Sequence, residues 1–124
     1  MIWFGFSPDN LFFQKYNNMI SYNDFRKVEI RIGKVLSCEK VEDADKLLKL
    51  EVDFGEYKRQ IISAIAESYN PEELIGRKFP FVVNLEPIKI RGFESQGMIL
   101  AIDIPEKTVL IEPTEEAPEG AEVI

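Results

Sequence analysis

Short runs in which apolar and polar residues alternate recur between residues 28 and 103, and this pattern restricts the chain to a β-rich fold. Successive side chains of a strand point to opposite faces of a sheet, so an alternating run buries one face and leaves the other solvated. Val28, Ile30 and Ile32, for example, fall on one face. We predict five strands, which lie in the runs 22–41, 46–53, 58–64, 79–85 and 96–103.

The residues between these runs predict how the strands are connected. Residues 54–57 suit a hairpin connection between the second and third strands. Asn70 can cap, and Pro71 can begin, a helix of little more than one turn. Gly33 lies inside the first strand, where glycine indicates a bend or bulge. Five strands with a small helix between the third and fourth is the order of an OB-fold barrel, so we predict an all-β fold of that kind.

The length of 124 residues fits one domain with additional segments at its ends. We predict an aromatic N-terminal appendage in residues 1–20, the OB-fold in residues 21–104 and an extension of strand material in residues 105–124. Strand edges left unpaired favour association. The extension therefore pairs either within its own chain or across a symmetric dimer, in which case it is a dimerisation element.

The charge of the chain is unevenly distributed. Seven acidic residues and one lysine lie in residues 103–124, so this segment carries −6 of the net charge of −7. The rest of the chain is nearly neutral, and its cations cluster in residues 26–49 and 77–91. The acidic total is therefore no objection to a polyanionic partner such as nucleic acid.

The sequence contains no histidine, which excludes Ser-His and Cys-His catalysis and every zinc site that needs a histidine ligand. The single cysteine, Cys38, lies in an alternating run and suits the core better than a nucleophile's position. Asp43 and Asp45 lack a third convergent ligand, so a loop or capping role is a simpler interpretation than a metal or acid–base pair. We predict a protein that is not an enzyme and that uses no metal and no other cofactor.

Nothing in the sequence indicates a membrane segment. Its apolar runs all fall short of the roughly 18 residues of a membrane span, and the first segment lacks the basic and continuous apolar regions of a signal peptide. A lone cysteine rules out an internal disulfide, as suits a reducing compartment. We predict a cytoplasmic protein with no membrane partner.

The segment 83–100 places polar and charged side chains between apolar runs. Lys89 and Arg91 are two residues apart, so in an extended chain they project to one side, while Ile88 and Ile90 project to the other. Surface cations are most often only solvated, but this pair also suits contact with an anion. In an OB-fold the segment connects the fourth and fifth strands, and such connections help to bind oligonucleotides.

Three short motifs occur in order along the chain: Ala-Asp-Lys-Leu at 44–47, Asn-Leu-Glu-Pro at 84–87 and Glu-Ser-Gln-Gly-Met at 94–98. Together they resemble the family of structure-specific tRNA-binding OB-fold domains, which occurs as a free homodimer, as a C-terminal part of methionyl-tRNA synthetases and in cytokine-releasing synthetase cofactors. The resemblance implies a groove that binds tRNA by its shape and a homodimer built by the C-terminal extension. It also implies action alone or in trans with an aminoacyl-tRNA synthetase.

The resemblance implies which residues face the RNA. The RNA-facing and basic positions of the family fall on Lys34, Lys46, Asn84, Lys89, Arg91, Ser95, Gln96 and Met98. Phe93 either stacks on a base or packs into the mouth of the barrel. The acidic pair Glu42 and Asp43 stands where the family often has His-Pro, and it would weaken any RNA contact by that loop.

A rival function is polypeptide binding. The same barrel resembles an export-related, chaperone-like protein, and the aromatic N-terminus and acidic tail would suit a protein partner. We place tRNA binding first because the chaperone-like group lacks the complete Glu-Ser-Gln-Gly-Met motif.

Overall fold

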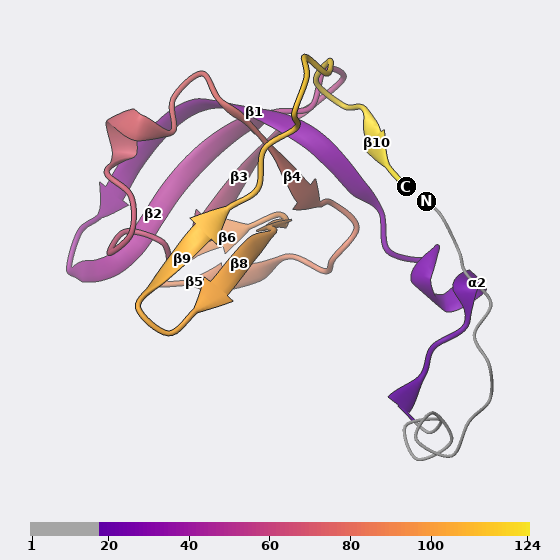
Figure 1. Cartoon of the computed structure of the whole chain (residues 1–124). Coiled ribbons are helices and arrows are strands. Elements are labelled where there is room, and N and C mark those ends of the chain that lie inside the picture. Colours follow the sequence, from indigo (N-terminus) through magenta and orange to yellow (C-terminus); the bar gives the residue numbers. More distant parts are fainter. Residues whose placement is uncertain (1–17) are drawn as a thin grey trace.

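The computed structural model describes residues 18–124, and most of its regular structure is β-strand (Figure 1). One short α-helix and one turn of 3₁₀-helix accompany the strands. In chain order the elements are α2 (Tyr22–Phe25), β1 (Ile30–Val41), β2 (Ala44–Asp53), β3 (Lys58–Ser63), η2 (Pro71–Glu73), β4 (Lys78–Val82), β5 (Ile88–Ile90), β6 (Phe93–Ser95), β7 (Met98–Ile99), β8 (Ala101–Ile104), β9 (Lys107–Leu110) and β10 (Glu122–Val123).

Six strands form one antiparallel sheet, in which β3, β2, β1, β4 and β7 are neighbours in that order and β10 pairs with the start of β1. The long strands β1 and β2 are strongly curved (Figure 1). The curvature brings the two ends of the sheet together. They meet where the Gln96 N–H, beside β7, donates to the Gln60 carbonyl oxygen of β3 at 2.8 Å. No strand ladder joins β3 to β7 in the described chain.

The second, third and fourth predicted strands are confirmed, the first is confirmed only from Ile30 onward, and the fifth is divided. Residues 98–99 form β7 in the main sheet, and Ala101–Ile104 forms β8, which leaves that sheet to pair with β9. The 54–57 connection is confirmed as a hairpin turn, in which Gly55 has φ 88° and its N–H donates to Asp53 Oδ1 at 2.8 Å.

The core lies inside the curve of the sheet and is built from the apolar side chains of β1 to β4. Phe54 is 1% exposed, and its ring meets Phe81 edge to face at a centroid distance of 5.5 Å. Cys38 is a core residue, as predicted, and burial raises the pKa of its thiol to about 11. At neutral pH this thiol is protonated, which suits packing rather than nucleophilic chemistry.

Two predictions of local structure need correction. Gly33, expected at a bend or bulge, does not mark a bulge, because it pairs regularly with Phe79 and the register shifts of β1 lie between Val35 and Ser37 and between Lys40 and Val41. Gly33 is instead required by close packing: a Cβ there would lie 2.6 Å from Cε1 of Phe54. The first run does not begin as a strand at Tyr22 either. Residues Tyr22–Phe25 form α2, since the Ser21 hydroxyl oxygen accepts a hydrogen bond from Asp24 N–H and caps the helix.

The predicted helix after residue 70 is a single 3₁₀ turn, η2. Pro71 begins it as expected, and Glu73 Oε1 accepts a hydrogen bond from Asn70 N–H at 3.3 Å. The chain then reverses at Gly76, which has φ 84°.

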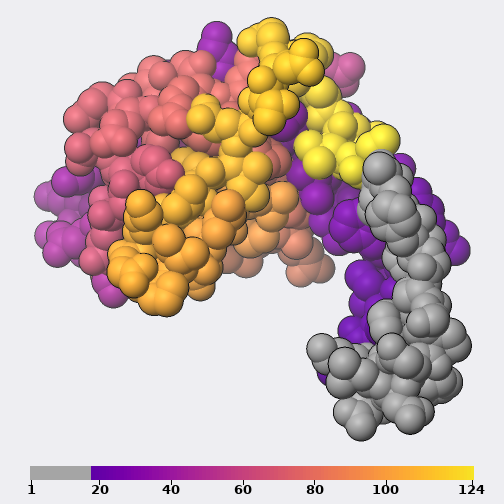
Figure 2. All heavy atoms as spheres, viewed as in Figure 1, coloured from indigo at the N-terminus to yellow at the C-terminus, as the bar shows by residue number. Residues whose placement is uncertain are grey.

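The C-terminal extension pairs within its own chain. β9 forms a hairpin with β8, and β10 pairs with Ile30 and Arg31 at the start of β1. Ion pairs hold the acidic segment to cations at the end of α2 and at the start of β4: Arg77 lies 2.7 Å from Glu112, Arg26 lies 3.4 Å from Glu122, and Lys78 contacts Glu116. The C-terminal residues accordingly lie against the start of the described chain (Figure 2).

Acid should weaken this attachment. The hydrogen bond from Arg77 lowers the pKa of Glu112, and a hydrogen bond from its own backbone, followed by one from Lys78, lowers that of Glu119. A carboxyl group whose pKa is lowered on folding stabilises the fold above its unfolded pKa of about 4.5, and this contribution is lost as pH falls through the folded pKa. We expect the free energy of unfolding to decline below about pH 4.5. Denaturant titrations between pH 7 and pH 3 should show a smaller decline for Glu112→Gln, and superimposable pH profiles would contradict this account.

Candidate nucleic-acid interface

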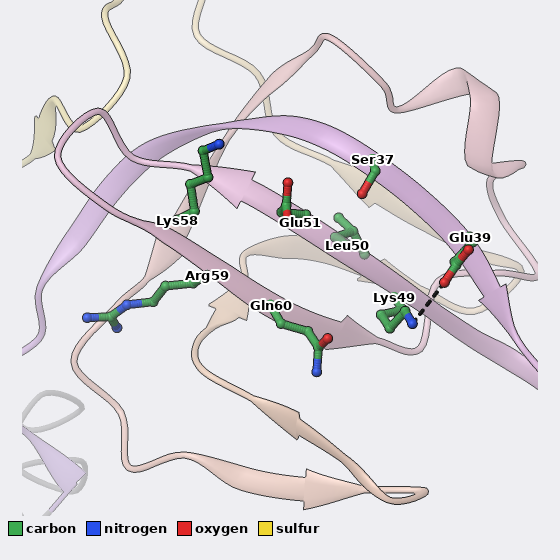
Figure 3. A pocket seen from close by; sticks show the side chains of 8 residues that line it. All are labelled: Ser37, Glu39, Lys49, Leu50, Glu51, Lys58, Arg59 and Gln60. Carbon is green, nitrogen blue, oxygen red and sulfur yellow. Dashed lines mark ion pairs between the residues drawn. The ribbon is translucent and has the colours of Figure 1, made fainter.

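A pocket of about 320 Å³ opens on the outer face of β1, β2 and β3 (Figure 3). Charged and polar side chains on these strands line it, while the buried side chains of β2, such as Leu48 and Val52, alternate with its exposed ones. The strand register places Ser37, Glu51 and Gln60 opposite one another. The polar lining of the pocket includes Ser37, Glu39, Lys49, Glu51, Lys58 and Gln60.

Lys49 links the pocket to the hairpin formed by β5 and β6. Its Nζ lies 2.8 Å from Oε1 of Glu39 and 4.6 Å from the centroid of the Phe93 ring. Phe93 belongs to β6 and is half-buried. The ring therefore lies beside the polar face of the sheet, with the Lys49 ammonium over it.

The β5–β6 hairpin is fastened to the edge of β3 by hydrogen bonds. Gln60 Nε2 donates to the Glu94 carbonyl oxygen at 2.9 Å, and Gln60 N–H donates to Gln96 Oε1 at 3.0 Å. Ser95 is only 4% exposed, and its Oγ accepts from Ile62 N–H at 3.0 Å while donating to the Gly97 carbonyl oxygen at 3.1 Å. Ser95 and Gln96, predicted to face RNA, thus position this hairpin against β3.

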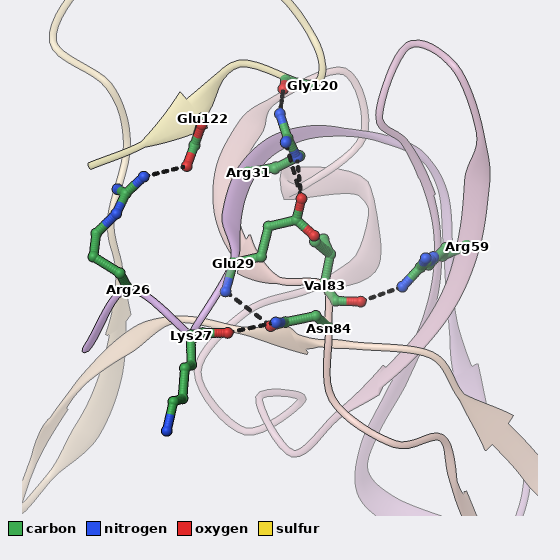
Figure 4. Close-up of polar contacts among 9 residues, drawn as sticks. All are labelled: Arg26, Lys27, Glu29, Arg31, Arg59, Val83, Asn84, Gly120 and Glu122. Atoms are coloured by element: carbon green, nitrogen blue, oxygen red, sulfur yellow. Dashed lines mark hydrogen bonds and ion pairs between the residues drawn. The ribbon is translucent and has the colours of Figure 1, made fainter. Parts of the chain in front are cut away.

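Asn84 has a similar structural role at the end of β4 (Figure 4). Its Oδ1 accepts from Glu29 N–H at 2.8 Å, and its Nδ2 donates to the Lys27 carbonyl oxygen at 2.6 Å. Both polar atoms of the amide therefore hold the segment that leads into β1.

Arg59 joins β3 to the end of β4 and to the segment before β7. Its guanidinium donates to the carbonyl oxygen of Val83 (Figure 4) and to that of Gln96, and it lies 4.6 Å from the ring centroid of Tyr57. This arginine takes part in holding together the two ends of the sheet.

The predicted cations do not line the pocket, and they do not form one cluster. Lys46 is exposed near the turn between β1 and β2, Lys34 lies opposite Asp53, and Lys89 is exposed in β5. The extended conformation expected of Arg91 is wrong, because Arg91 has φ 52° and Gly92 has φ 85° in the two-residue turn between β5 and β6. Its position is thus the tip of the hairpin.

Met98, the last predicted residue, lies in a different place. It is 47% exposed and lines an apolar pocket of about 560 Å³ together with Leu85 and Ile88, both of them exposed. Ile62 and Ile90 complete the apolar lining. Glu86, Ser95 and Gly97 also line this pocket, which shares no lining residue with the polar pocket of the β1–β3 face.

Sequence reasoning missed the residues that line the polar pocket. Lys49, Glu51 and Lys58 are absent from the predicted set, although the alternation of 46–53 already placed Lys49 and Glu51 opposite the buried leucines. The cross-strand register, which brings these positions beside Ser37 and Gln60, is a tertiary property.

The described residues contain no group of three or more potential metal ligands of the Asp, Glu, Cys or His type. Asp43, considered above with Asp45, has φ 60° in the turn between β1 and β2, which suits the predicted loop role. No helix of the described chain is long and apolar enough to cross a membrane. The arrangement at the β1–β3 face can supply cations, hydrogen-bond donors and acceptors, and one aromatic ring to a bound ligand.

Comparison with known proteins identifies relatives of most of the chain. Residues 30–122 match a family model described as "Putative tRNA binding domain". The chain is 49% identical over 106 residues to the methionine–tRNA ligase of Methanothrix thermoacetophila and 50% identical over 104 residues to that of Archaeoglobus fulgidus. These matches cover 86% and 84% of this chain but only 16% of each ligase, so the chain spans about one sixth of the length of these relatives.

Solved structures show the same similarity. A MetRS-related protein from Pyrococcus horikoshii is 44% identical with a TM-score of 0.82, and the match covers 86% of this chain and 98% of that one. The chaperone CsaA from Bacillus anthracis is 36% identical with a TM-score of 0.78, covering 86% and 99%. The C-terminal domain of p43 from Plasmodium vivax is 31% identical with a TM-score of 0.74, covering 78% and 59%.

Proposed function

The chain belongs to the tRNA-binding domain family, and from this premise we propose that it is a non-catalytic protein that binds tRNA by its shape. It would act in the cytoplasm, alone or in trans with an aminoacyl-tRNA synthetase of the methionyl type. The homology extends to CsaA and to the C-terminal domain of p43. The resemblance drawn from its motifs is thereby confirmed.

The distribution of ion pairs is the observation that carries this proposal. The acidic C-terminal segment pairs with Arg26, Arg77 and Lys78. In contrast, the ion pairs among residues 18–124 leave Lys46 of β2, Lys58 of β3, and Lys89 and Arg91 of the β5–β6 hairpin without a carboxylate partner. Cations of this kind suit phosphate contacts, which position a nucleic acid without specifying its sequence.

The fold proposed for this role is a five-stranded OB-fold barrel in residues 21–104, with residues 105–124 as an extension. Support comes from the hydrogen bonds of Gln60, Ile62 and Arg59, which link β3 to the segment that leads into β7. In OB-folds the face of the second and third strands and the connection between the fourth and fifth bind oligonucleotides. In this chain the corresponding parts are the polar pocket on β1–β3 and the β5–β6 hairpin. The proposed appendage, residues 1–20, falls largely outside the described residues.

The hairpin cations are the first residues to test. Lys89→Gln combined with Arg91→Asn removes both charges, and asparagine at 91 tolerates the positive φ of the turn before Gly92. We expect tRNA affinity to fall roughly tenfold while the melting temperature changes little. Filter binding and thermal melts on the same preparation measure both, with Lys107→Gln in β9 as the control. Unchanged tRNA binding would remove the hairpin from the interface.

We also propose a homodimer, in which two copies hold one tRNA at a fixed geometry and gain affinity from two-site contact. Because β10 pairs within its own chain, the dimer would not form by exchange of this strand. The second copy would instead pack against the apolar surface around β10. Val123 and Ile124 are exposed there, and so are Tyr22 and Val28 of the segment before β1. Sedimentation with and without tRNA reports assembly and RNA binding together, and a monomer in both conditions would overturn the dimer.

Polypeptide binding is a second candidate, favoured by the apolar pocket around Met98. Exposed Leu85 and Ile88 there suit an apolar side chain, and the relatives include a chaperone. Competition between bulk tRNA and an unfolded polypeptide separates the two functions. Binding of the polypeptide alone would replace the proposed function with this one.

A further inference from the structure

Glu51 places a carboxylate in the middle of the proposed RNA surface (Figure 3). It lies in β2 between Ser37 of β1 and Gln60 of β3. The side chain is exposed, and the ion pairs recorded for residues 18–124 do not include it, whereas Glu39 in the same pocket is paired with Lys49. A carboxylate repels phosphate groups. A contact between Glu51 and the RNA must therefore be made to another part of the nucleotide.

The donors that a nucleotide offers to a carboxylate lie mainly on its base. Carboxylates accept hydrogen bonds from amino groups of bases, and a base removed from a helix exposes its Watson–Crick edge. Guanine presents two adjacent donors on that edge, N1–H and N2–H, which match the two oxygens of one carboxylate. Uracil presents a single N3–H between two carbonyl oxygens, which a carboxylate repels.

The surroundings of Glu51 suit one unpaired nucleotide. The pocket of about 320 Å³ is at the lower end of the range for small-ligand sites, so it is too small for a helical segment. Lys58 lines the same pocket and can contact the phosphate, while the Ser37 hydroxyl can donate or accept at the ribose. Phe93, at the Lys49 side, supplies an aromatic edge.

We propose that Glu51 recognises an unpaired guanine of the bound RNA through the N1–H and N2–H groups of the base. The inference rests on the proposed function, because it assigns a base-recognition role within the same RNA surface. It adds a sequence preference to binding that is otherwise governed by shape and phosphate contacts.

Fluorescence anisotropy with labelled heptamers tests the inference. The three probes are all-uridine RNA and the same RNA with a central guanosine or a central inosine, which lacks the N2 amino group. The wild-type protein should bind the guanosine heptamer roughly tenfold more tightly than the all-uridine one, with inosine between them. In Glu51→Gln the preference should disappear, while the all-uridine heptamer binds equally well or better because a negative charge is gone. Glu72→Gln, in η2 outside the pocket, is the matched control and should keep the preference.

Binding of bulk tRNA, measured in parallel, separates the failure of this inference from failure of the proposed function. If the wild-type protein binds tRNA but does not prefer the guanosine heptamer, only the inference is overturned. The same conclusion follows if it binds tRNA but no heptamer binding is detected. A uniform gain of affinity for all heptamers in Glu51→Gln does the same, because it is the result expected of a solvated charge near phosphates. A wild-type protein that binds neither tRNA nor heptamers overturns both.

Discussion

Raising the salt concentration from about 50 to about 200 mM should weaken tRNA binding by roughly 50- to 150-fold. Each phosphate neutralised by a protein cation releases condensed counterions, so the logarithm of the affinity falls with the logarithm of salt by about 0.7 to 0.9 per contact. Four exposed cations, Lys46, Lys58, Lys89 and Arg91, give a slope of roughly −3 if each contacts one phosphate. Binding isotherms at four or more salt concentrations measure it.

Charge removal within the surface sharpens this measurement. Lys46→Gln combined with Lys58→Gln should reduce the magnitude of the slope by roughly 1.4 to 1.8. Lys107→Gln, in β9 and away from the pocket, should leave the slope unchanged. An isotherm that does not change between low and physiological salt would show that phosphate contacts do not carry the affinity, and it would remove the main support for this interface.

Phe54→Ala should lower the free energy of unfolding by about 3 to 5 kcal/mol. The ring of Phe54 is 1% exposed, stacks on Tyr57 at a centroid distance of 5.4 Å and meets Phe81 at 5.5 Å. Its removal leaves a cavity beside Gly33 and between the rings of Tyr57 and Phe81, so several elements lose their packing together. Urea denaturation measures the change.

Ile75→Ala is the control for this variant, because Ile75 is also a large apolar residue but is 49% exposed. Its loss should change the free energy of unfolding by roughly 0.5 kcal/mol or less. A cost below about 1 kcal/mol for Phe54→Ala would mean that the site collapses around the missing ring. The central place of Phe54 in the core would then be contradicted.

The strands could be predicted because their signal is local. Alternation in 46–53 and 58–64 appears as β2 (Ala44–Asp53) and β3 (Lys58–Ser63), and the turn residues between them form the expected hairpin. The fifth strand was less predictable, since residues 98–102 are apolar without alternation and the pattern does not say which partner each half takes. Pairing with β4 and with β9 divides the run between two sheets.

The sequence predicted which segment of the chain contributes to the candidate site, but not which side chains face a ligand. The segment 83–100 does lie beside the polar face, but Ser95, Gln96 and Asn84 use their side chains to hold β3 and the segment before β1. A sequence motif shows that a polar group is needed, and it does not show whether the group's hydrogen-bond partner is the protein or a ligand.

The sequence by itself determined most of the strand segments, the place of Cys38 in the core and membership of the tRNA-binding family. These follow from side-chain periodicity and from motifs, which are read along the chain. Only the tertiary structure decided that the acidic extension pairs within its own chain, that Gly33 makes room for Phe54 and that Glu51 stands among cations on one face. The reason is that register and curvature depend on contacts between residues far apart in the chain, and these contacts set which side chains share a surface.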